Sequence, residues 1–136
     1  MVLDASVILK WFLQEKDTES ALKLKEKILT ENISVFLPDL VLFEVANALR
    51  FKPEYDEKAA TEAINSLLDL GFDIVKPDRD ILNSTLKISF RYLVTVYDAV
   101  YLALAKRMKC EFITADEKLF LKVRDLPKTF LLSKIH

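Results

Sequence analysis

Short apolar segments that suit buried strands alternate with longer segments of helical periodicity along the whole chain. We expect strands at residues 2–3, 33–37, 72–75, 111–114 and 129–132, and helices at residues 5–13, 18–30, 40–51, 57–70, 80–92, 97–109 and 117–124. Parallel strands are joined by helices that cover both faces of their sheet. This alternation therefore predicts an α/β fold, a three-layer α/β/α sandwich with a central parallel sheet of about five strands.

Local signals mark the ends of two of these helices. Asp39 is placed to cap the helix at residues 40–51. Gly71, the only glycine, follows the helix at residues 57–70 and is expected to end it in a left-handed conformation. No linker or internal repeat divides the sequence, so we expect one domain over residues 1–136.

The residue types exclude several kinds of chemistry. Cys110 is the only cysteine and His136 the only histidine, which argues against a disulfide framework, a Cys-based zinc site, His-ligated metals and Ser-His-Asp or Cys-His catalysis. With 20 basic and 21 acidic residues, the chain is not expected to coat nucleic acid with a basic face. An enzyme that contacts nucleic acid in one local cleft stays open.

The start of the chain lacks the positive charge of a signal peptide, and no run of 18 uncharged apolar residues occurs. We therefore expect no membrane insertion. The single cysteine favours a reducing compartment, so the expected location is the cytoplasm.

Four acidic residues lie in apolar surroundings where acids are not expected. Asp4 ends the first strand, and Asp116 follows the fourth. Glu44 and Asp98 lie in helices that are apolar nearly all round. Burying an ionised carboxylate costs several kcal/mol unless it is paired or coordinates a metal ion, so these acids require an explanation.

The predicted fold brings the four acids to one edge of the sheet. A helix from Asp98 to residue 109 rises roughly 17 Å, and the following strand returns roughly 16 Å, so Asp98 and Asp116 end at the same level. Asp4 stands at the carboxyl end of its strand, and Glu44 lies early in the helix after the second strand. Ligands of open parallel sheets bind at this edge.

Four carboxylates that converge without a histidine repel one another, and a divalent cation relieves that repulsion. Hard oxygen ligands suit Mg²⁺ or Mn²⁺. A cation with open coordination positions can activate a water molecule and stabilise charge on a phosphate, which is how many enzymes cleave phosphodiesters.

The segments around these acids resemble a known family. Leu3-Asp4-Ala5-Ser6, the helix from Glu44 to Leu49, the helix from Tyr97 to Ala105 and the turn Thr114-Ala115-Asp116 are similar to those of PIN domains, above all the VapC toxins of prokaryotic toxin–antitoxin pairs. The resemblance covers essentially the whole chain.

This resemblance implies a metal-dependent endoribonuclease that hydrolyses RNA. Asp4, Glu44, Asp98 and Asp116 would form an acidic quartet around Mg²⁺ or Mn²⁺, and Ser6 and Thr114 would order metal-bound water or hold the acids. It also implies a homodimer or higher homo-oligomer, and a cognate antitoxin protein that covers the acidic groove.

Simpler interpretations exist for some of these residues. Asp116 could act as an ordinary helix cap, and Ser6 and Thr114 could have local structural roles only. For the whole chain, the alternatives are a PIN nuclease of RNA processing, a catalytically silent PIN binding module and a phosphoacceptor signalling domain. The last would need paired acids after the first strand, where Asp4 stands alone.

Aromatic and basic residues give weaker signals. The aromatic side chains at helical spacing are expected in the core or a dimer face rather than in base stacking: Trp11, Phe12, Phe43, Phe51 and Tyr101. Several basic residues are candidates for phosphate contacts, although solvated surface charges are the simpler interpretation: Lys10, Arg50, Lys52, Arg91 and Lys118.

Overall fold

The computed structural model describes residues 1–135, and His136 lies outside the described residues. Its centre is a sheet of five parallel strands in the order β3-β2-β1-β4-β5. The strands are β1 (Val2–Leu3), β2 (Phe36–Pro38), β3 (Asp73–Val75), β4 (Phe112–Thr114) and β5 (Thr129–Leu131). The predicted parallel five-stranded sheet is confirmed.

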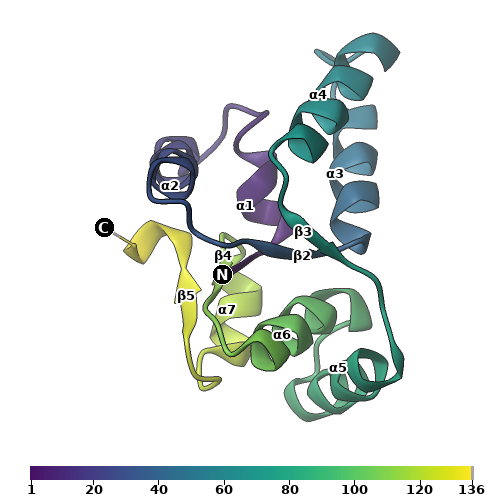
Figure 1. The fold of residues 1–136 in the computed structure, drawn as a ribbon, viewed down its shortest axis with the longest axis vertical. Helices are drawn as coiled ribbons and strands as arrows, with labels where there is room; N and C mark the ends of the chain where they lie inside the picture. The colour runs from purple at the N-terminus through teal and green to yellow at the C-terminus, as the bar shows by residue number, and fades with distance from the viewer. Residues whose placement is uncertain (136) are drawn as a thin grey trace.

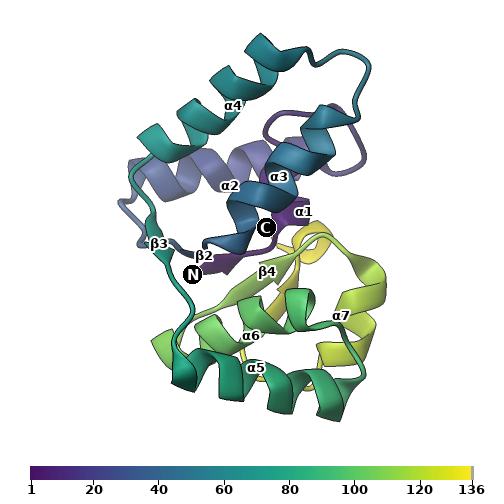
Figure 2. The same ribbon diagram turned by 90° about the vertical axis from the view of Figure 1, so that its right-hand side faces the viewer.

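Seven helices cover the sheet in two layers. They are α1 (Ala5–Leu9), α2 (Thr18–Thr30), α3 (Leu40–Arg50), α4 (Glu57–Asp69), α5 (Arg79–Tyr92), α6 (Val96–Met108) and α7 (Glu117–Val123), and a 3₁₀ turn, η1 (Leu132–Lys134), follows β5. Helices α1 to α4 lie above the sheet and α5 to α7 below it in both views (Figures 1 and 2). This is the predicted α/β/α sandwich.

The chain changes direction across the sheet between β1 and β4. From β1 it moves outward to β2 and β3, and it then crosses back by α5 and α6 to β4, on the other side of β1. The register pairs Val2 with Phe112 and Leu3 with Ile113. The carboxyl ends of β1 and β4 therefore meet at a topological switch point, where open α/β sheets bind their ligands.

The largest differences from the predicted boundaries are in α1 and β2, and the other elements begin and end within one residue of the prediction. Helix α1 ends at Leu9, four residues early, because the N–H groups of Lys10, Trp11 and Phe12 bond three residues back rather than four. Strand β2 begins at Phe36 and includes Pro38, which pairs with Val75 of β3. On its other side, the pairing of β2 with β1 is limited to Val2 and Phe36, since Pro38 has no N–H to donate.

The predicted cap at Asp39 is wrong. Asp39 already has helical dihedral angles (φ −59°, ψ −23°), and its side chain makes no capping hydrogen bond. A capping residue needs an extended backbone so that its side chain can reach the next turn, and β2 leads into α3 without one. By contrast, Gly71 has a φ of 72°, which confirms the expected left-handed conformation after α4.

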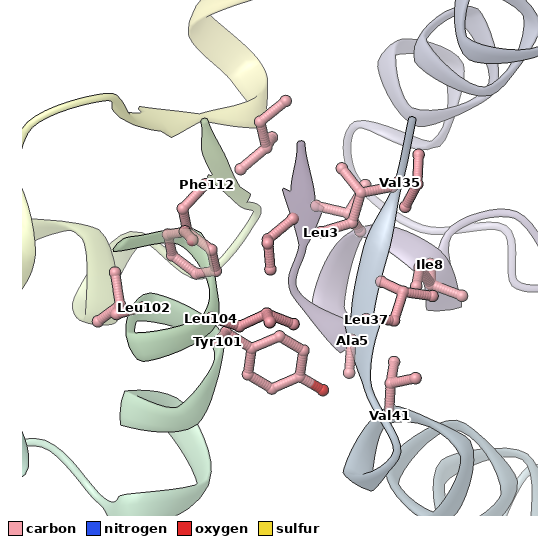
Figure 3. Packing of buried hydrophobic residues seen from close by; sticks show 14 of the residues in the cluster. Leu3, Ala5, Ile8, Val35, Leu37, Val41, Tyr101, Leu102, Leu104 and Phe112 are labelled. Atoms are coloured by element: carbon pink, nitrogen blue, oxygen red, sulfur yellow. The ribbon is translucent and has the colours of Figure 1, made fainter. Parts of the chain in front are cut away.

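Helix α6 packs across the middle of the sheet, and five of its residues, Tyr101 to Ala105, are buried in succession. Figure 3 shows the Tyr101 ring between the strands and α3, with its hydroxyl oxygen directed toward Ala5 and Val41. No single helix within residues 1–135 is long and apolar enough to cross a membrane. Only α5 and α6 taken together, bent by 118°, have the length and composition.

Candidate active site

Asp4 is held at the switch point by two hydroxyl groups. Its backbone N–H donates to the carbonyl of Ile113 (2.9 Å), which extends the pairing of β1 with β4. Asp4 is 6% exposed, and its carboxylate Oδ2 accepts hydrogen bonds from Ser6 Oγ and Thr114 Oγ1, both at 2.7 Å. Asp4 precedes α1 but makes no side-chain cap, so capping does not explain this buried acid.

The same two hydroxyls join the ends of β1 and β4. Ser6 Oγ accepts from the N–H of Ala115 (3.0 Å), and Thr114 Oγ1 accepts from the N–H of Asp116 (3.0 Å). The two hydroxyl oxygens are 3.4 Å apart. The position of Asp116 is thereby tied to the carboxylate of Asp4 through Thr114.

Glu44 reaches the site from α3 and is held by a residue that the sequence did not single out for chemistry. The hydroxyl of Tyr101 donates to Glu44 Oε1 at 2.5 Å. Burial raises the pKa of Tyr101, and the hydrogen bond to Glu44 raises it further, so the phenol stays a donor. From its helical spacing, Tyr101 is expected only in the core or in a dimer face. Its spacing of three residues from Asp98, on one side of a helix, was the available signal.

Asp98 lies in the first turn of α6, and Asp116 directly precedes α7. Thr95 caps α6 by accepting from the N–H of Asp98 (3.1 Å). Asp116 caps α7 through Oδ1, which accepts from the N–H of Leu119 (3.0 Å). The capping interpretation of Asp116 is therefore correct for one of its two carboxylate oxygens.

Each of the four acids keeps an oxygen without a hydrogen-bond partner among residues 1–135. The hydrogen bonds to Asp4 both end on Oδ2, the bond from Tyr101 to Glu44 ends on Oε1, and the cap formed by Asp116 uses Oδ1. The other carboxylate oxygen of each of these residues is left free. Within residues 1–135, none of the four acids forms an ion pair with a lysine or an arginine. The free oxygens are available to a cation.

The acids disturb one another's ionisation. Burial raises the pKa of Asp4, and the negative charges of Asp98 and Asp116 raise it further. The hydrogen bonds from Ser6 and Thr114 lower this pKa, but by less than burial raises it. Burial raises the pKa of Glu44, as do Asp4 and Asp98, against the lowering effect of the Tyr101 bond. Burial and Asp116 also raise the pKa of Asp98, against smaller effects of Thr95 and Lys122. The four carboxylates therefore form one electrostatic cluster.

The donor set fits a hard divalent cation, with a limit set by the geometry. Within residues 1–135, no three acidic, histidine or cysteine side chains stand close enough together to hold a metal ion. Mg²⁺ characteristically keeps several water molecules and is bound through one or two carboxylates, with substrate phosphates completing its shell. A loosely assembled all-oxygen cluster suits that mode of binding.

Lysines stand beside two of the acids. Asp98 and Asp116 line a hollow of about 150 Å³ together with Lys118 and Lys122, and Lys122 Nζ donates to the carbonyl of Leu93 (3.3 Å). The sequence makes Lys118 a candidate for phosphate contacts, whereas nothing in the sequence distinguishes Lys122 from a surface lysine. Lys10, a second candidate for phosphate contacts, is buried, and its Nζ lies 3.9 Å from Glu15 Oε1.

Comparison with known proteins places the chain in a family. Residues 1–126 match the PIN domain family, and the chain belongs to it. More particularly, it is similar to Ribonuclease VapC3 of Pyrobaculum aerophilum, with 30% identity over 123 residues that cover 88% of this chain and 91% of that protein.

Solved structures share this fold. A toxin–antitoxin complex from Klebsiella pneumoniae matches with a TM-score of 0.70 and 19% identity, over 98% of each chain. FitAcB from Neisseria gonorrhoeae matches with a TM-score of 0.74 and 16% identity, over 98% of this chain and 99% of that one. The predicted PIN-like fold is confirmed.

Proposed function

We propose that this protein is a metal-dependent endoribonuclease, the toxin of a toxin–antitoxin pair, and that it hydrolyses RNA phosphodiester bonds at Asp4, Glu44, Asp98 and Asp116. One observation carries the proposal. Four carboxylates from four separate segments gather around the switch point of the sheet, three of them with raised pKa values and each with a free oxygen. The similarity to a VapC ribonuclease supports the same activity.

Mg²⁺ or Mn²⁺ would be held among these four acids, directly by the free oxygens of one or two of them and through retained water molecules by the others. When bound, such a cation makes a water molecule acidic enough to attack phosphorus and offsets the charge that develops on the phosphate. The protein contributes the position of each ligand. Ser6 and Thr114 fix Asp4, and Tyr101 fixes Glu44, so that one oxygen of each carboxylate stays available.

Lys118 and Lys122 are suited to bind the RNA backbone. They line the same hollow as Asp98 and Asp116, and a phosphate that approaches the acids would pass these ammonium groups. Phosphate contacts of this kind position a strand without reading its sequence. The hydrolysis itself would remain the task of the acidic cluster.

The proposed partners are an RNA substrate, a cognate antitoxin protein and a second copy of this chain. Structural neighbours that are themselves toxin–antitoxin complexes support the antitoxin. An antitoxin that covers the acidic hollow would block access to RNA. Since the proposed substrate is cellular RNA, we place the protein in the cytoplasm.

RNA cleavage by the purified protein tests this proposal. We expect RNA to be cut in Mg²⁺ or Mn²⁺, and cutting to stop with EDTA and to resume when the metal is restored. Asp98→Asn keeps the size of the side chain but removes its charge, and it should abolish cleavage. Asp69→Asn, at an exposed acid that ends α4, should cut at the parent rate.

The alternatives give different results in the same assay. Cleavage at the parent rate by Asp98→Asn, or in EDTA, would contradict the acidic-cluster mechanism. A catalytically silent binding module would cut neither RNA nor single-stranded DNA with any metal, although metal binding would still be detected by calorimetry.

A further inference from the structure

One side of helix α3 carries polar and aromatic residues that lead away from the candidate active site. Glu44, Asn47 and Phe51 are spaced by three and four residues, which places them on the same side of the helix. Helix α3 begins at the sheet and runs away from it (Figures 1 and 2). Phe51, which directly follows α3, therefore lies roughly 10 Å beyond Glu44 along the helix axis.

Phe51 is exposed although it is large and apolar. It is 72% exposed, so it does not lie in the core, which is one of the two places that its helical spacing suggests. The guanidinium carbon of Arg50 lies 5.1 Å from the centroid of the Phe51 ring, and this cation–π contact holds the ring from one side. At this exposure the other face of the ring is open to a planar ligand.

Two polar residues flank the ring. Lys52 follows Phe51, is exposed, and forms no ion pair within residues 1–135. Asn47, between Glu44 and Phe51, presents an exposed amide that can both donate and accept hydrogen bonds. An aromatic ring, an amide and an ammonium group in a row are the groups with which proteins contact the base, the sugar and the phosphate of a nucleotide.

The acids at the start of α4 lie on another side of α3. Asp56 and Glu57 line a hollow together with Arg50, and Phe51 does not border that hollow. An anionic strand that follows the Glu44 side of α3 would therefore avoid these two carboxylates.

We propose that Asn47, Phe51 and Lys52 form a nucleotide subsite, in which a base of single-stranded RNA stacks on the Phe51 ring. This proposal deepens the proposed ribonuclease function and rests on it, since the strand would run from the acidic cluster along α3. Stacking accepts any base, because every base has a π-face. A base reaches the ring only when it is unpaired, so the subsite selects single strands. The lysines beside Asp98 and Asp116 would hold the same strand at α7.

RNA binding, measured separately from cleavage, tests the subsite. Fluorescence anisotropy of a short labelled single-stranded RNA gives Kd in the Asp98→Asn background, in which no cleavage is expected. Phe51→Ala in that background should raise Kd by about 5- to 150-fold, the range for the loss of one base–aromatic stack. Phe51→Leu should bind as weakly, and Phe51→Trp should keep the affinity, because only an aromatic ring stacks on a base.

Phe90→Ala in the same background is the matched control. Phe90 is 79% exposed and lies on α5, in the layer of helices on the other face of the sheet from α3 (Figure 1). Removing its ring deletes an exposed aromatic surface of the same kind, and it should leave the Kd for RNA unchanged.

Three further measurements separate stacking from a structural effect. Duplex RNA of the same sequence should bind equally with and without Phe51→Ala, because paired bases are closed to the ring. Lys52→Gln should reduce the slope of log Kd against log salt concentration by about 0.7, the contribution of one phosphate contact to a single strand. In cleavage assays with Asp98 intact, Phe51→Ala should act mainly on KM, since stacking binds substrate and transition state alike.

Equal affinity of single-stranded RNA with and without Phe51→Ala would overturn the subsite and leave this side of α3 to a protein partner. An equal loss of affinity for duplex and single-stranded RNA would also overturn it. The two proposals fail separately. Cleavage of RNA with a Kd that ignores Phe51 would contradict the subsite alone, whereas a Phe51-dependent Kd without any cleavage would support the subsite and contradict the ribonuclease.

Discussion

Replacing Thr114 by valine is the sharpest test of how the acidic cluster is held. The side chain is fully buried, and its hydroxyl donates to Asp4 Oδ2 at 2.7 Å while it accepts from the N–H of Asp116 at 3.0 Å. Valine has nearly the same shape but no hydroxyl, so the change removes both hydrogen bonds and leaves the packing in place.

The expected cost follows from the charge on Asp4. A hydrogen bond to a charged group contributes about 1.5–3 kcal/mol, and Ser6 remains to bond the same oxygen. For a domain of this size, 1 kcal/mol changes Tm by roughly 4 °C, so we expect Tm to fall by roughly 6–12 °C at neutral pH. The Thr114 bond lowers the pKa of Asp4, so its removal costs less in acid, where Asp4 is protonated.

Thr85→Val is the matched control. Thr85 is 3% exposed, and its hydroxyl has no partner within residues 1–135. A buried hydroxyl without a partner is itself unfavourable, so the same substitution there should leave Tm unchanged or raise it. Thermal unfolding of the metal-free proteins, followed by circular dichroism at neutral pH and at about pH 5, measures both effects.

Equal shifts of Tm in the two variants would refute this reasoning. The hydroxyl of Thr114 would then contribute no more to stability than the hydroxyl of Thr85, which has no hydrogen-bond partner within residues 1–135. The link between Asp4 and Asp116 would not stabilise the fold. A loss in Thr114→Val that grew toward acidic pH would also be contradictory, because the bond would then be to a neutral carboxyl group.

The remaining predictions concern the charge of the cluster and the backbone. Tyr101→Phe removes the donor that lowers the pKa of Glu44. Loss of such an orienting partner should lower kcat by ~10–100-fold, and the acid limb of the pH profile of kcat should move to higher pH. An unshifted limb would exclude this positioning role. Burial raises the folded-state pKa values of Asp4, Glu44 and Asp98 above their ordinary values, so their contribution to stability is present in acid and lost as pH rises through the raised values. Mg²⁺ should therefore raise Tm more at neutral pH than at about pH 5, and a larger rise in acid would argue against binding at these carboxylates. Gly71→Ala should lower the free energy of unfolding, measured with urea, by about 1–2 kcal/mol. The cause is the backbone φ of 72°, because the space around the added methyl group is open. An unchanged free energy of unfolding would show that the backbone carries no strain there.

Most of the fold could be predicted because the responsible signals are local. The apolar segments and helical periodicity located every strand and helix, and α2 begins and ends at the predicted residues. The failures were at element ends. The early end of α1 and the missing cap at Asp39 depend on how the chain leaves a strand, which neighbouring strands determine and residue types do not.

The candidate site was predictable in part for the same reason. An acid in an apolar helix is costly wherever it lies, so Glu44 and Asp98 were conspicuous in the sequence. Tyr101 was not, because an apolar helix accepts an aromatic residue without explanation. Its role depends on the hydroxyl meeting a carboxylate 57 residues away in the chain.

The sequence by itself determined the α/β alternation, the residues with buried charge and the edge of the sheet where they gather. Only the tertiary structure decided the strand order, which sets β1 beside β4 and so brings Thr114 onto Asp4 across 110 residues. The reason is physical. Burial and periodicity are properties of a segment, whereas strand order, hydrogen bonds between distant side chains and the exposure of Phe51 arise only when segments pack together.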